Sequence, residues 1–371
     1  MPSVGVIFGG PSPEHDISIL TGLQAYRVLA NAGWSASALY WSKSSEWFRL
    51  EGTLEAPDFL QGAPAKAEAI SLRVGGESGV FPARDSRFSK GRPYEYDVLV
   101  NCCHGGPGED GTLQSLLDQI GIPYTGPSQR SAALGMDKLA FAGVMSLAGV
   151  PLLPRVLLDR DLDEIPFDGP YIVKPRFGGS SIGIEVVSDL ATAMLRLNGN
   201  VHLRAGAIVE PYRADLFDLQ LAVRTFPELR LSQIERPLRG GSGAEILSYG
   251  DKYIAGEGMA TAPRELPARL ADETAAEIMR LGAIVARSAG VRGVARIDFL
   301  ASEAGELFVN EVNTIPGSLS HYLWVEPKWA FVDQLLNDIE EAKARPAVTT
   351  VSAGADGTVL RSASQVAAKL A

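Results

Sequence analysis

Short apolar runs alternate with helical patterns through the first third of the chain. Residues 4–8 form one apolar run that ends at the turn Gly9-Gly10, and the helical pattern after it is expected to end at Gly33. A second strand pattern follows at residues 35–40, and residues 97–102 have the composition of a strand buried on both faces. This order predicts β-α-β units built on a parallel sheet.

An amphipathic helix follows that sheet pattern. Its apolar positions are spaced i, i+3, i+4 and i+7, and they are Leu113, Leu116, Leu117 and Ile120. Gly121 stands where a helix C-terminus favours glycine. Residues 41–95, which precede it, are irregular and rich in Gly, Pro and Ser, so only a possible hairpin is expected there.

Two further units are predicted. The first begins near Ser131 with a helix through Asp137 and Lys138, and it continues with strands at 171–174 and 184–187. The second contains strands at 219–224 and 229–235, a Gly-rich stretch at 240–259, a helix that buries Ile278, Leu281 and Val285, and an antiparallel hairpin of 293–300 with 305–312. We therefore predict an N-terminal domain (1–130), a central domain (131–215), a C-terminal domain (216–346) and a poorly ordered tail (347–371).

Composition narrows the class of protein. A chain of 371 residues corresponds to roughly two or three domains, and 46% hydrophobic with 21% charged residues is ordinary globular usage. The net charge of -10 argues against a broad nucleic-acid surface but leaves a local anion site open. The two cysteines are adjacent, Cys102 and Cys103, and no apolar run reaches the roughly 18 residues of a spanning helix. We expect a cytoplasmic protein that associates with neither nucleic acid nor membrane.

A glycine-rich loop at residues 175–183 follows the strand that ends in Lys174. Its small residues, Ser180 and Ser181 among them, allow several backbone N–H groups to converge on one anion, and the lysine adds a fixed charge. This combination suits a triphosphate. A tight hairpin beside a surface lysine explains the pattern equally well, and the loop is not a P-loop.

The last predicted hairpin carries the strongest polar cluster. Alternation places Arg296 and Asp298 on one face of the first strand, and Glu311 and Asn313 on one face of its partner. Carboxylate and amide oxygens on rigid strands suit Mg²⁺, which takes the rest of its ligands from water and nucleotide phosphates. The alternative is a solvated sheet face. The opposite face is expected to be apolar, with Val294, Ile297, Phe299 and Val312.

Two loops follow strands at the edge where α/β sheets place ligands. Residues 101–111 contain His104 among four glycines, followed by Glu109 and Asp110, and we favour a functional histidine over a turn residue. In the loop at 9–16, Asp16 can be a plain helix N-cap, and that interpretation is compatible with Glu14 binding a substrate ammonium group.

In this order the segments resemble the D-alanine:D-alanine ligases of the ATP-grasp superfamily. The resemblance covers residues 4 to about 329. It rests on Phe8-Gly9-Gly10 with Glu14, His104-Gly105 with 108–112, Met136-Asp137-Lys138, Lys174-Pro175 with 179–183, Asp251-Lys252-Tyr253, Arg296-Ile297-Asp298, and 310–314 with Pro316-Gly317. It implies an α/β (α+β ATP-grasp) fold, in which an N-terminal parallel-sheet domain precedes central and C-terminal ATP-grasp domains that hold ATP between them.

The resemblance also implies a role for each matching residue. ATP would be bound by Lys138 and Lys174 at its phosphates, by Glu210, Pro211, Tyr212 and Arg213 at the adenine and by Asp218 at the ribose, with Ser180, Ser181 and Lys252 in the same site. Two Mg²⁺ or Mn²⁺ ions would be held by Asp298, Glu311 and Asn313. The first amino acid would contact His104 and the linked trio Glu14, Ser180 and Tyr253, and Lys252 and Tyr253 would lie on a closing loop. Arg296 and the Gly317 backbone would stabilise the oxyanion.

The site for the second amino acid departs from the family. Tyr322, just before Leu323, occupies the position where the family usually has a serine that binds the carboxylate of the second substrate. A tyrosine can donate one hydrogen bond, but its ring takes up space beside the incoming amino acid. Asp218 also replaces the commoner glutamate, after a slightly longer hinge.

The implied function is ATP-dependent joining of two D-alanines through an acyl phosphate for peptidoglycan, by a homodimer whose partners are small amino acids. Two alternatives stay open. A relative with a different second amino acid or peptide is favoured by Tyr322. A non-catalytic nucleotide-binding regulator is disfavoured, because it needs neither metal ligands nor an oxyanion arginine.

Overall fold

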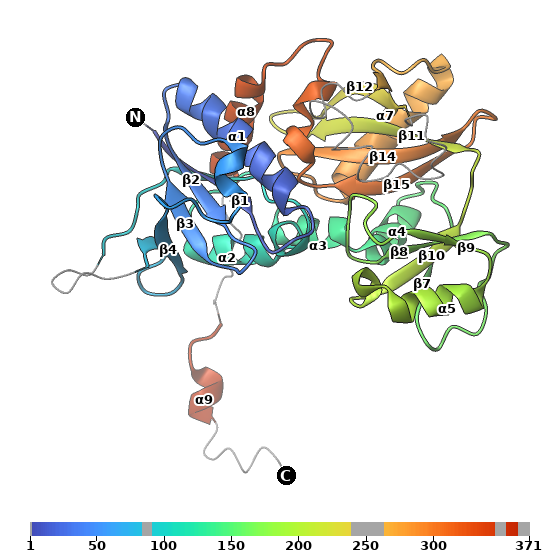
Figure 1. The fold of residues 1–371 in the computed structure, drawn as a ribbon, viewed down its shortest axis with the longest axis horizontal. Coiled ribbons are helices and arrows are strands. Elements are labelled where there is room, and N and C mark those ends of the chain that lie inside the picture. The colour runs from blue at the N-terminus through green and yellow to red at the C-terminus, as the bar shows by residue number, and fades with distance from the viewer. Residues whose placement is uncertain (1, 84–90, 239–262, 346–353, 363–371) are drawn as a thin grey trace.

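The structure, a computed structural model, describes residues 2–83, 91–238, 263–345 and 354–362. Three β-sheets organise this part of the chain, and they follow one another along the sequence (Figure 1). They fall within the three predicted domain ranges, whose boundaries stay a prediction. The predicted Gly-rich stretch 240–259 and most of the predicted poorly ordered tail lie outside the described residues, although a short helix, α9 (Thr358–Ser362), is described within the tail.

The N-terminal sheet has six strands in the order β5-β4-β3-β2-β1-β6. The strands are β1 (Ser3–Gly9), β2 (Ser35–Trp41), β3 (Trp47–Leu50), β4 (Glu68–Arg73), β5 (Gly79–Pro82) and β6 (Val98–Asn101). β1 pairs in parallel with β2 and β6, as predicted, but β3, β4 and β5 add antiparallel strands. The irregular region thus holds more than one hairpin. Its short strands are held by aromatic packing, such as Trp41 stacked on Trp47 at 4.8 Å between ring centroids.

Helices cover this sheet on both sides. Helix α1 (His15–Asn31) ends two residues before Gly33, and α2 (Thr112–Ile120) ends at Gly121, which has a φ of 80° that favours glycine. Both predicted helix ends are therefore confirmed.

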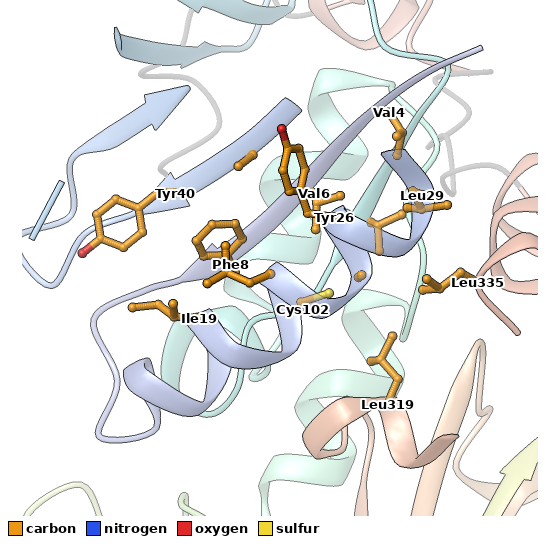
Figure 2. Packing of buried hydrophobic residues seen from close by; sticks show 14 of the residues in the cluster. Val4, Val6, Phe8, Ile19, Tyr26, Leu29, Tyr40, Cys102, Leu319 and Leu335 are labelled. Atoms are coloured by element: carbon orange, nitrogen blue, oxygen red, sulfur yellow. The ribbon is translucent and has the colours of Figure 1, made fainter. Parts of the chain in front are cut away.

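The core beneath α1 includes residues from the far end of the chain. Leu335 and Ile339 of α8 (Phe331–Ala344), both fully buried, pack with Phe8, Leu29 and Cys102. Figure 2 shows Leu335 close to α1, with Leu319 below it. The C-terminal end of the third predicted domain therefore completes the core of the first.

The central sheet has the order β7-β10-β8-β9. Its antiparallel strands are β7 (Val156–Leu158), β8 (Tyr171–Pro175), β9 (Glu185–Val187) and β10 (Ala207–Pro211), and α5 (Leu190–Gly199) packs on it. Two helices precede this sheet, α3 (Gln129–Met136) and α4 (Lys138–Leu147).

The prediction of one helix through Asp137 and Lys138 is wrong, because the helix breaks at Asp137. The Asp137 carboxylate accepts hydrogen bonds from the Leu139 and Ala140 amides, which caps α4. It also pairs with the Arg176 guanidinium at 2.6 Å. Together these hydrogen bonds hold Asp137 in an extended backbone conformation between the two helices.

The C-terminal sheet has the order β13-β12-β11-β14-β15 and is antiparallel. Its strands are β11 (Leu216–Arg224), β12 (Arg230–Pro237), β13 (Arg264–Glu265), β14 (Val294–Ser302) and β15 (Leu307–Asn313). Helix α7 (Asp272–Ser288) buries Ile278, Leu281 and Val285 against one face of it. The predicted hairpin is confirmed.

The prediction that Val294 lies on the apolar face of this hairpin is wrong. Ile297, Phe299 and Val312 pack under α7, whereas Val294 packs with Ala222, Leu323 and Trp324 on the face of Arg296. Val294 precedes Arg296 by two residues, and alternate residues of a strand point to the same face.

Short 3-10 segments connect several of these elements, and they are Ala56–Phe59, Gly106–Gly108 and Val201–Leu203. A longer 3-10 segment, Gly317–Leu323, is interrupted at residues 318–320, which have positive φ. Among the described residues, none of the helices combines the length and apolar character that crossing a bilayer requires.

Candidate active site

Two pockets lie side by side between the sheets and share part of their walls. The larger encloses about 1020 Å³ of empty space and the smaller about 630 Å³, both including space open to solvent. Lys138, Gly178, Gly179 and Glu311 line both. A molecule in one pocket can therefore reach a molecule in the other across this junction.

The larger pocket combines apolar walls with cations and carboxylates. Its apolar side is formed by Leu153, Ile172, Ile184, Leu216 and Leu300. It also contains the predicted nucleotide and metal residues Lys138, Lys174, Ser181, Glu210, Pro211, Tyr212, Arg213, Asp218, Asp298 and Glu311. Apolar walls beside fixed cations suit a purine nucleotide and its phosphates.

Glu210 holds two cations under this pocket. Its carboxylate lies 2.7 Å from the Lys174 ammonium and 3.1 Å from the Arg155 guanidinium, and the side chain is 1% exposed. Burial raises the pKa of Glu210, but Lys174, Arg155 and Lys138 outweigh it and lower the pKa below its usual value. The carboxylate thus holds the Lys174 ammonium and the Arg155 guanidinium in place at the wall of the pocket.

The β14–β15 pairing contains a bulge that places a further polar side chain near Lys174. Asp298 pairs with Glu311 and Phe299 with Val309, which leaves Asn310 as the extra residue. The Asn310 side-chain oxygen lies 3.4 Å from the Lys174 ammonium.

The glycine-rich loop connects the two pockets. Ser180 and Ser181 have φ values of 52° and 58°, a conformation that L-residues adopt at a cost and that is concentrated at functional sites. The Ser180 hydroxyl donates to Glu14, and the Lys138 ammonium donates to the carbonyl of Gly178. A side chain at Gly179 would lie 3.1 Å from Glu14, so the close approach of loop and carboxylate requires a glycine or a shift.

The smaller pocket brings together most residues predicted for the first amino acid. Glu14, His104, Ser180, Arg296, Asn313 and Gly317 all line it. It holds an acidic group from the N-terminal loop and a guanidinium from β14. A small zwitterion, with its ammonium toward Glu14 and its carboxylate toward the cations, matches that distribution of charge.

Arg296, Asp298 and Asn313 form one hydrogen-bonded group on the C-terminal sheet. Arg296 donates to the two Asp298 oxygens at 2.6 and 2.8 Å, and the Asn313 amide donates to Asp298 at 3.1 Å. Across the hairpin from Asp298, Glu311 pairs with Lys138 at 3.1 Å. The predicted face of the hairpin is therefore correct.

These side chains have the donor chemistry that Mg²⁺ prefers. Within the described ranges, no cluster of three His, Cys, Asp or Glu side chains is able to hold a metal on its own. Mg²⁺ commonly takes one or two carboxylates from the protein and the remaining oxygens from phosphates and water. Asp298 and Glu311, both lining the larger pocket, and Asn313 beside them fit that arrangement.

His104 lines the smaller pocket, but both of its ring nitrogens bind protein groups. Nδ1 lies 2.6 Å from the Ile315 carbonyl and Nε2 lies 2.8 Å from the Thr21 hydroxyl. Burial lowers the pKa of His104 to about 4, so the ring is neutral near pH 7. The histidine thus joins α1 to the segment that follows β15 and supports the pocket wall.

Glu109 makes the same connection with a carboxylate. It accepts from the amides of Gly105 and Ile315, both at 2.9 Å, and from the Thr314 hydroxyl at 3.2 Å. Burial, with the nearby Glu14 carboxylate, raises the pKa of Glu109 to about 7. The sequence motif contained Glu109, but nothing local in it indicated partners more than 200 residues away.

Tyr322 and Leu323 line neither pocket. Tyr322 packs beside the cluster of Ala222, Val294, Leu323 and Trp324, and its buried hydroxyl has no hydrogen-bond partner among the residues that the structure describes. Residues 318–320, shortly before Tyr322, have φ values between 47° and 49°, which lie in the left-handed region. Lys252 and Tyr253 lie outside the described residues.

The fold and the paired pockets define an ATP-grasp enzyme, with a larger pocket of apolar walls and charged groups beside a smaller polar one. The family description "D-ala D-ala ligase N-terminus" matches residues 3–127, and "D-ala D-ala ligase C-terminus" matches residues 163–330. The chain belongs to the D-alanine–D-alanine ligase family, and it is an ATP-dependent ligase.

Individual relatives agree along most of the chain. A D-alanine–D-alanine ligase of Sodalis glossinidius is 31% identical over 86% of this chain and 89% of its own. Among solved structures, the VanG D-Ala:D-Ser ligase of Enterococcus faecalis is 26% identical with a TM-score of 0.76, covering 92% of this chain and 99% of its own. The D-alanine-D-alanine ligase of Coxiella burnetii, at 22% identity and a TM-score of 0.75 over 93% and 94% of the two chains, shares the fold.

Proposed function

We propose that this enzyme joins two D-alanines into D-alanyl-D-alanine for peptidoglycan synthesis, with ATP as the phosphoryl donor. The observation that carries the proposal is the junction of the two pockets at Lys138, Gly178, Gly179 and Glu311. A carboxylate held in the smaller pocket lies next to the phosphate end of a nucleotide in the larger one. Amino acids are the proposed partners and the cytoplasm the proposed location, and the resemblance supports a homodimer.

The first step activates a poor acyl donor. A carboxylate oxygen of the first D-alanine attacks the γ-phosphorus of ATP, which gives an acyl phosphate and ADP. Lys138 and Lys174 would offset the repulsion between the anions, and Glu210, Pro211, Tyr212, Arg213 and Asp218 would hold the base and ribose. Two Mg²⁺ or Mn²⁺ ions at Asp298, Glu311 and Asn313 would supply further charge neutralisation when bound.

The second step forms the peptide bond. The amine of the second amino acid attacks the acyl carbon, and phosphate leaves as the amine loses a proton. Arg296 and the Gly317 amide are the proposed donors to the developing oxyanion. Glu14 and Ser180 hold the first amino acid, with Tyr253 as the third member of the trio.

Water must be kept from the acyl phosphate, because hydrolysis would release the carboxylate again. The loop with Lys252 and Tyr253 is proposed for that closure on the basis of the family resemblance. Ser181 would add a backbone or hydroxyl contact to the phosphates.

A second candidate function is supported by Tyr322. One structurally similar protein is described as a D-Ala:D-Ser ligase, which takes a different second amino acid. If Tyr322 and Leu323 contact the second substrate here, the phenol changes the space and the hydrogen bonding offered to it. The chemistry with ATP would be the same.

One experiment separates these functions. Purified protein is incubated with ATP, Mg²⁺ and a panel of D- and L-amino acids, and phosphate release and product masses are recorded. D-Alanyl-D-alanine as the main product supports the proposal, and a mixed dipeptide supports the second candidate. Nucleotide binding without phosphate release under every condition contradicts both and favours a regulator.

A further inference from the structure

The segment that follows β15 is held at two points by side chains from the N-terminal part of the chain. This segment contains Gly317, which lines the smaller pocket. The carbonyl of Ile315, two residues before Gly317, lies 2.6 Å from Nδ1 of His104. The amide of Ser318, directly after Gly317, donates to the hydroxyl of Thr21 on α1 at 3.0 Å. Both flanks of Gly317 are therefore bonded to the N-terminal domain.

The hydrogen bonds of Thr21 and His104 form one chain with a fixed direction. A carbonyl oxygen only accepts, so Nδ1 of His104 carries the ring proton and donates to Ile315. Because burial keeps the ring neutral, Nε2 has a free lone pair, 2.8 Å from the Thr21 oxygen. The Thr21 hydroxyl donates to Nε2 and accepts from the Ser318 amide. One threonine hydroxyl thus links the two flanks of Gly317 to each other.

The backbone after Gly317 has a conformation that needs such support. Residues 318–320 have φ values between 47° and 49°, in the left-handed region that L-residues adopt at a cost. Strain of this kind persists only where the surrounding structure over-determines the backbone, and it is concentrated at functional sites. Besides the Thr21 contact, the side chain of Gln334 on α8 donates to the Leu319 carbonyl at 2.7 Å, and both side chains are fully buried. Helices α1 and α8 together hold this backbone.

We propose that Thr21 is a positioning residue whose hydroxyl, through His104 and the Ser318 amide, aims the Gly317 backbone at the oxyanion of the peptide-bond step. Thr21 lines neither pocket, whereas His104 and Gly317 line the smaller one. It therefore acts through these residues and does not touch the substrate. The inference rests on the proposed function, because the oxyanion belongs to the second step of that reaction.

The two chemical steps should depend on this link to different degrees. Phosphoryl transfer relies on Lys138, Lys174 and the proposed metal ligands, which belong to other elements of the fold. Attack by the second amine creates the tetrahedral oxyanion, and a donor stabilises it only when the donor points to the position of that oxygen. Loss of the Thr21 hydroxyl leaves His104 Nε2 and the Ser318 amide without this partner. It should therefore slow the second step more than the first.

Thr125 offers a matched control in the same predicted domain. It is also a buried threonine, 6% exposed, and its hydroxyl accepts from the backbone amide of Asn101 at 3.1 Å. Neither Thr125 nor Asn101 lines either pocket. Valine has nearly the shape of threonine, so Thr21→Val and Thr125→Val each remove a buried hydroxyl that accepts from a backbone amide. Of the two hydroxyls, the Thr21 hydroxyl is the one bonded to His104.

The test compares full-length wild type, Thr21→Val, Thr21→Ser and Thr125→Val. One measurement is the rate of formation of the dipeptide that wild type makes. The other uses ATP labelled with heavy oxygen at the β–γ bridge. Migration of the label to a non-bridging position reports that acyl phosphate and ADP form and return to ATP.

We expect Thr21→Val to form dipeptide about tenfold more slowly or worse, since a lost oxyanion donor costs about 100-fold or more. Its label migration per dipeptide formed should rise about fivefold or more, because an acyl phosphate that waits for the amine returns to ATP more often. Thr21→Ser keeps the hydroxyl and should recover most of the rate. Thr125→Val should match wild type in both measurements.

A dipeptide rate in Thr21→Val within twofold of wild type overturns the inference and leaves the proposed function standing. So does an unchanged ratio of label migration to dipeptide, which a general loss of structure would give, or a Thr21→Ser variant as slow as Thr21→Val. If Thr21→Val does not fold, Thr21→Ala, which also lacks the hydroxyl, carries the test. A wild type that forms no dipeptide from any amino acid overturns the proposed function and the inference together.

Discussion

The ammonium of Lys138 lies 3.1 Å from a carboxylate oxygen of Glu311, where the two pockets share a wall. Lys138 begins α4, just after the break at Asp137, and Glu311 belongs to β15. The pair therefore joins the helix that precedes the central sheet to the C-terminal sheet at the site of proposed phosphoryl transfer. Both groups would change partners as a nucleotide and its metal ions bind.

Glu311→Gln should reduce turnover to well below a tenth of wild type while the protein stays folded. A neutral amide is a weaker ligand for a divalent ion and no longer balances Lys138. Steady-state ADP release and a thermal melt check this, with Glu303→Gln on the exposed turn of the same hairpin as the control. Activity above about a tenth, a difference of roughly 1.4 kcal/mol, contradicts the metal assignment.

D-Alanine should be the amino acid that is phosphorylated at the first site. Ser180→Ala should raise its Michaelis constant about tenfold or more, because the hydrogen bond to Glu14 that fixes the carboxylate is lost. The measurement is ATP consumption as a function of D- or L-alanine. Ser188→Ala, at an exposed serine that bonds Asp189, is the control. Stimulation by L-amino acids alone would show that the first-site assignment is wrong.

Tyr322→Ser should shift the products toward D-alanyl-D-alanine. A gained or lost hydrogen bond to a carboxylate corresponds to about 1.5–3 kcal/mol, enough to change the product ratio more than tenfold. Because the ring is partly buried against an apolar cluster, its truncation will also destabilise the fold, by less than the roughly 3–5 kcal/mol of a fully buried aromatic side chain. Tyr322→Phe keeps the ring and separates the two effects. Identical products and identical acceptor Michaelis constants in wild type and both variants contradict the prediction.

Glu210→Gln should raise the Michaelis constant for ATP and lower the free energy of unfolding by about 3–5 kcal/mol. The substitution leaves the buried cations Lys174 and Arg155 without their shared counterion. Glu185→Gln breaks the more exposed pair with Arg196 and should cost less than about 1 kcal/mol. Chemical denaturation compares the two, and equal costs would mean that Lys174 is held by other contacts.

The pH dependence of stability should reveal Glu109 and His104 as opposing groups. The pKa of Glu109 is raised to about 7, so the folded state binds the extra proton and stability falls as pH rises from about 4.5 to 7. The pKa of His104 is lowered to about 4, so the unfolded state binds the extra proton and stability rises from about pH 4 to 6.5. The two effects largely cancel between about pH 4.5 and 6.5.

Glu109→Gln removes the contribution of Glu109 to the pH dependence of stability. Relative to wild type, its unfolding free energy should increase as the pH rises through that window, whatever fixed loss the substitution causes. Denaturant titrations at pH 5 and 6.5 measure the difference. A difference between the two proteins that is the same at both pH values would contradict the raised pKa of Glu109.

Local sequence patterns predicted the parts of the site that are built locally. The alternation that places Arg296 and Asp298 on one face holds in the structure, because a strand alone fixes it. The bulge at Asn310 escaped prediction, since an extra residue shows only in the pairing of two strands. The break at Asp137 depends on Arg176, 39 residues away, and helical spacing carries no information about it.

His104 shows where such reasoning is incomplete. The glycines around it correctly indicated a loop at the edge of the sheet, and the residue does line the smaller pocket. Its hydrogen-bond partners are 83 and 211 residues distant, so the sequence could not show that both ring nitrogens are occupied. Hydrogen bonds to the Thr21 hydroxyl and the Ile315 carbonyl hold the histidine in place, and its contact with the substrate stays a prediction.

Helix α8 has a consequence for synthesis of the protein. Leu335, Ile339 and Ala342 fill the core under α1, so the hydrophobic side of the first helix lacks part of its cover until the ribosome has made about 340 residues. During that interval the nascent chain exposes a hydrophobic surface that is prone to aggregate or to bind a chaperone. A chain shortened before residue 331 would carry every pocket residue discussed above and still lack the last layer of its first core.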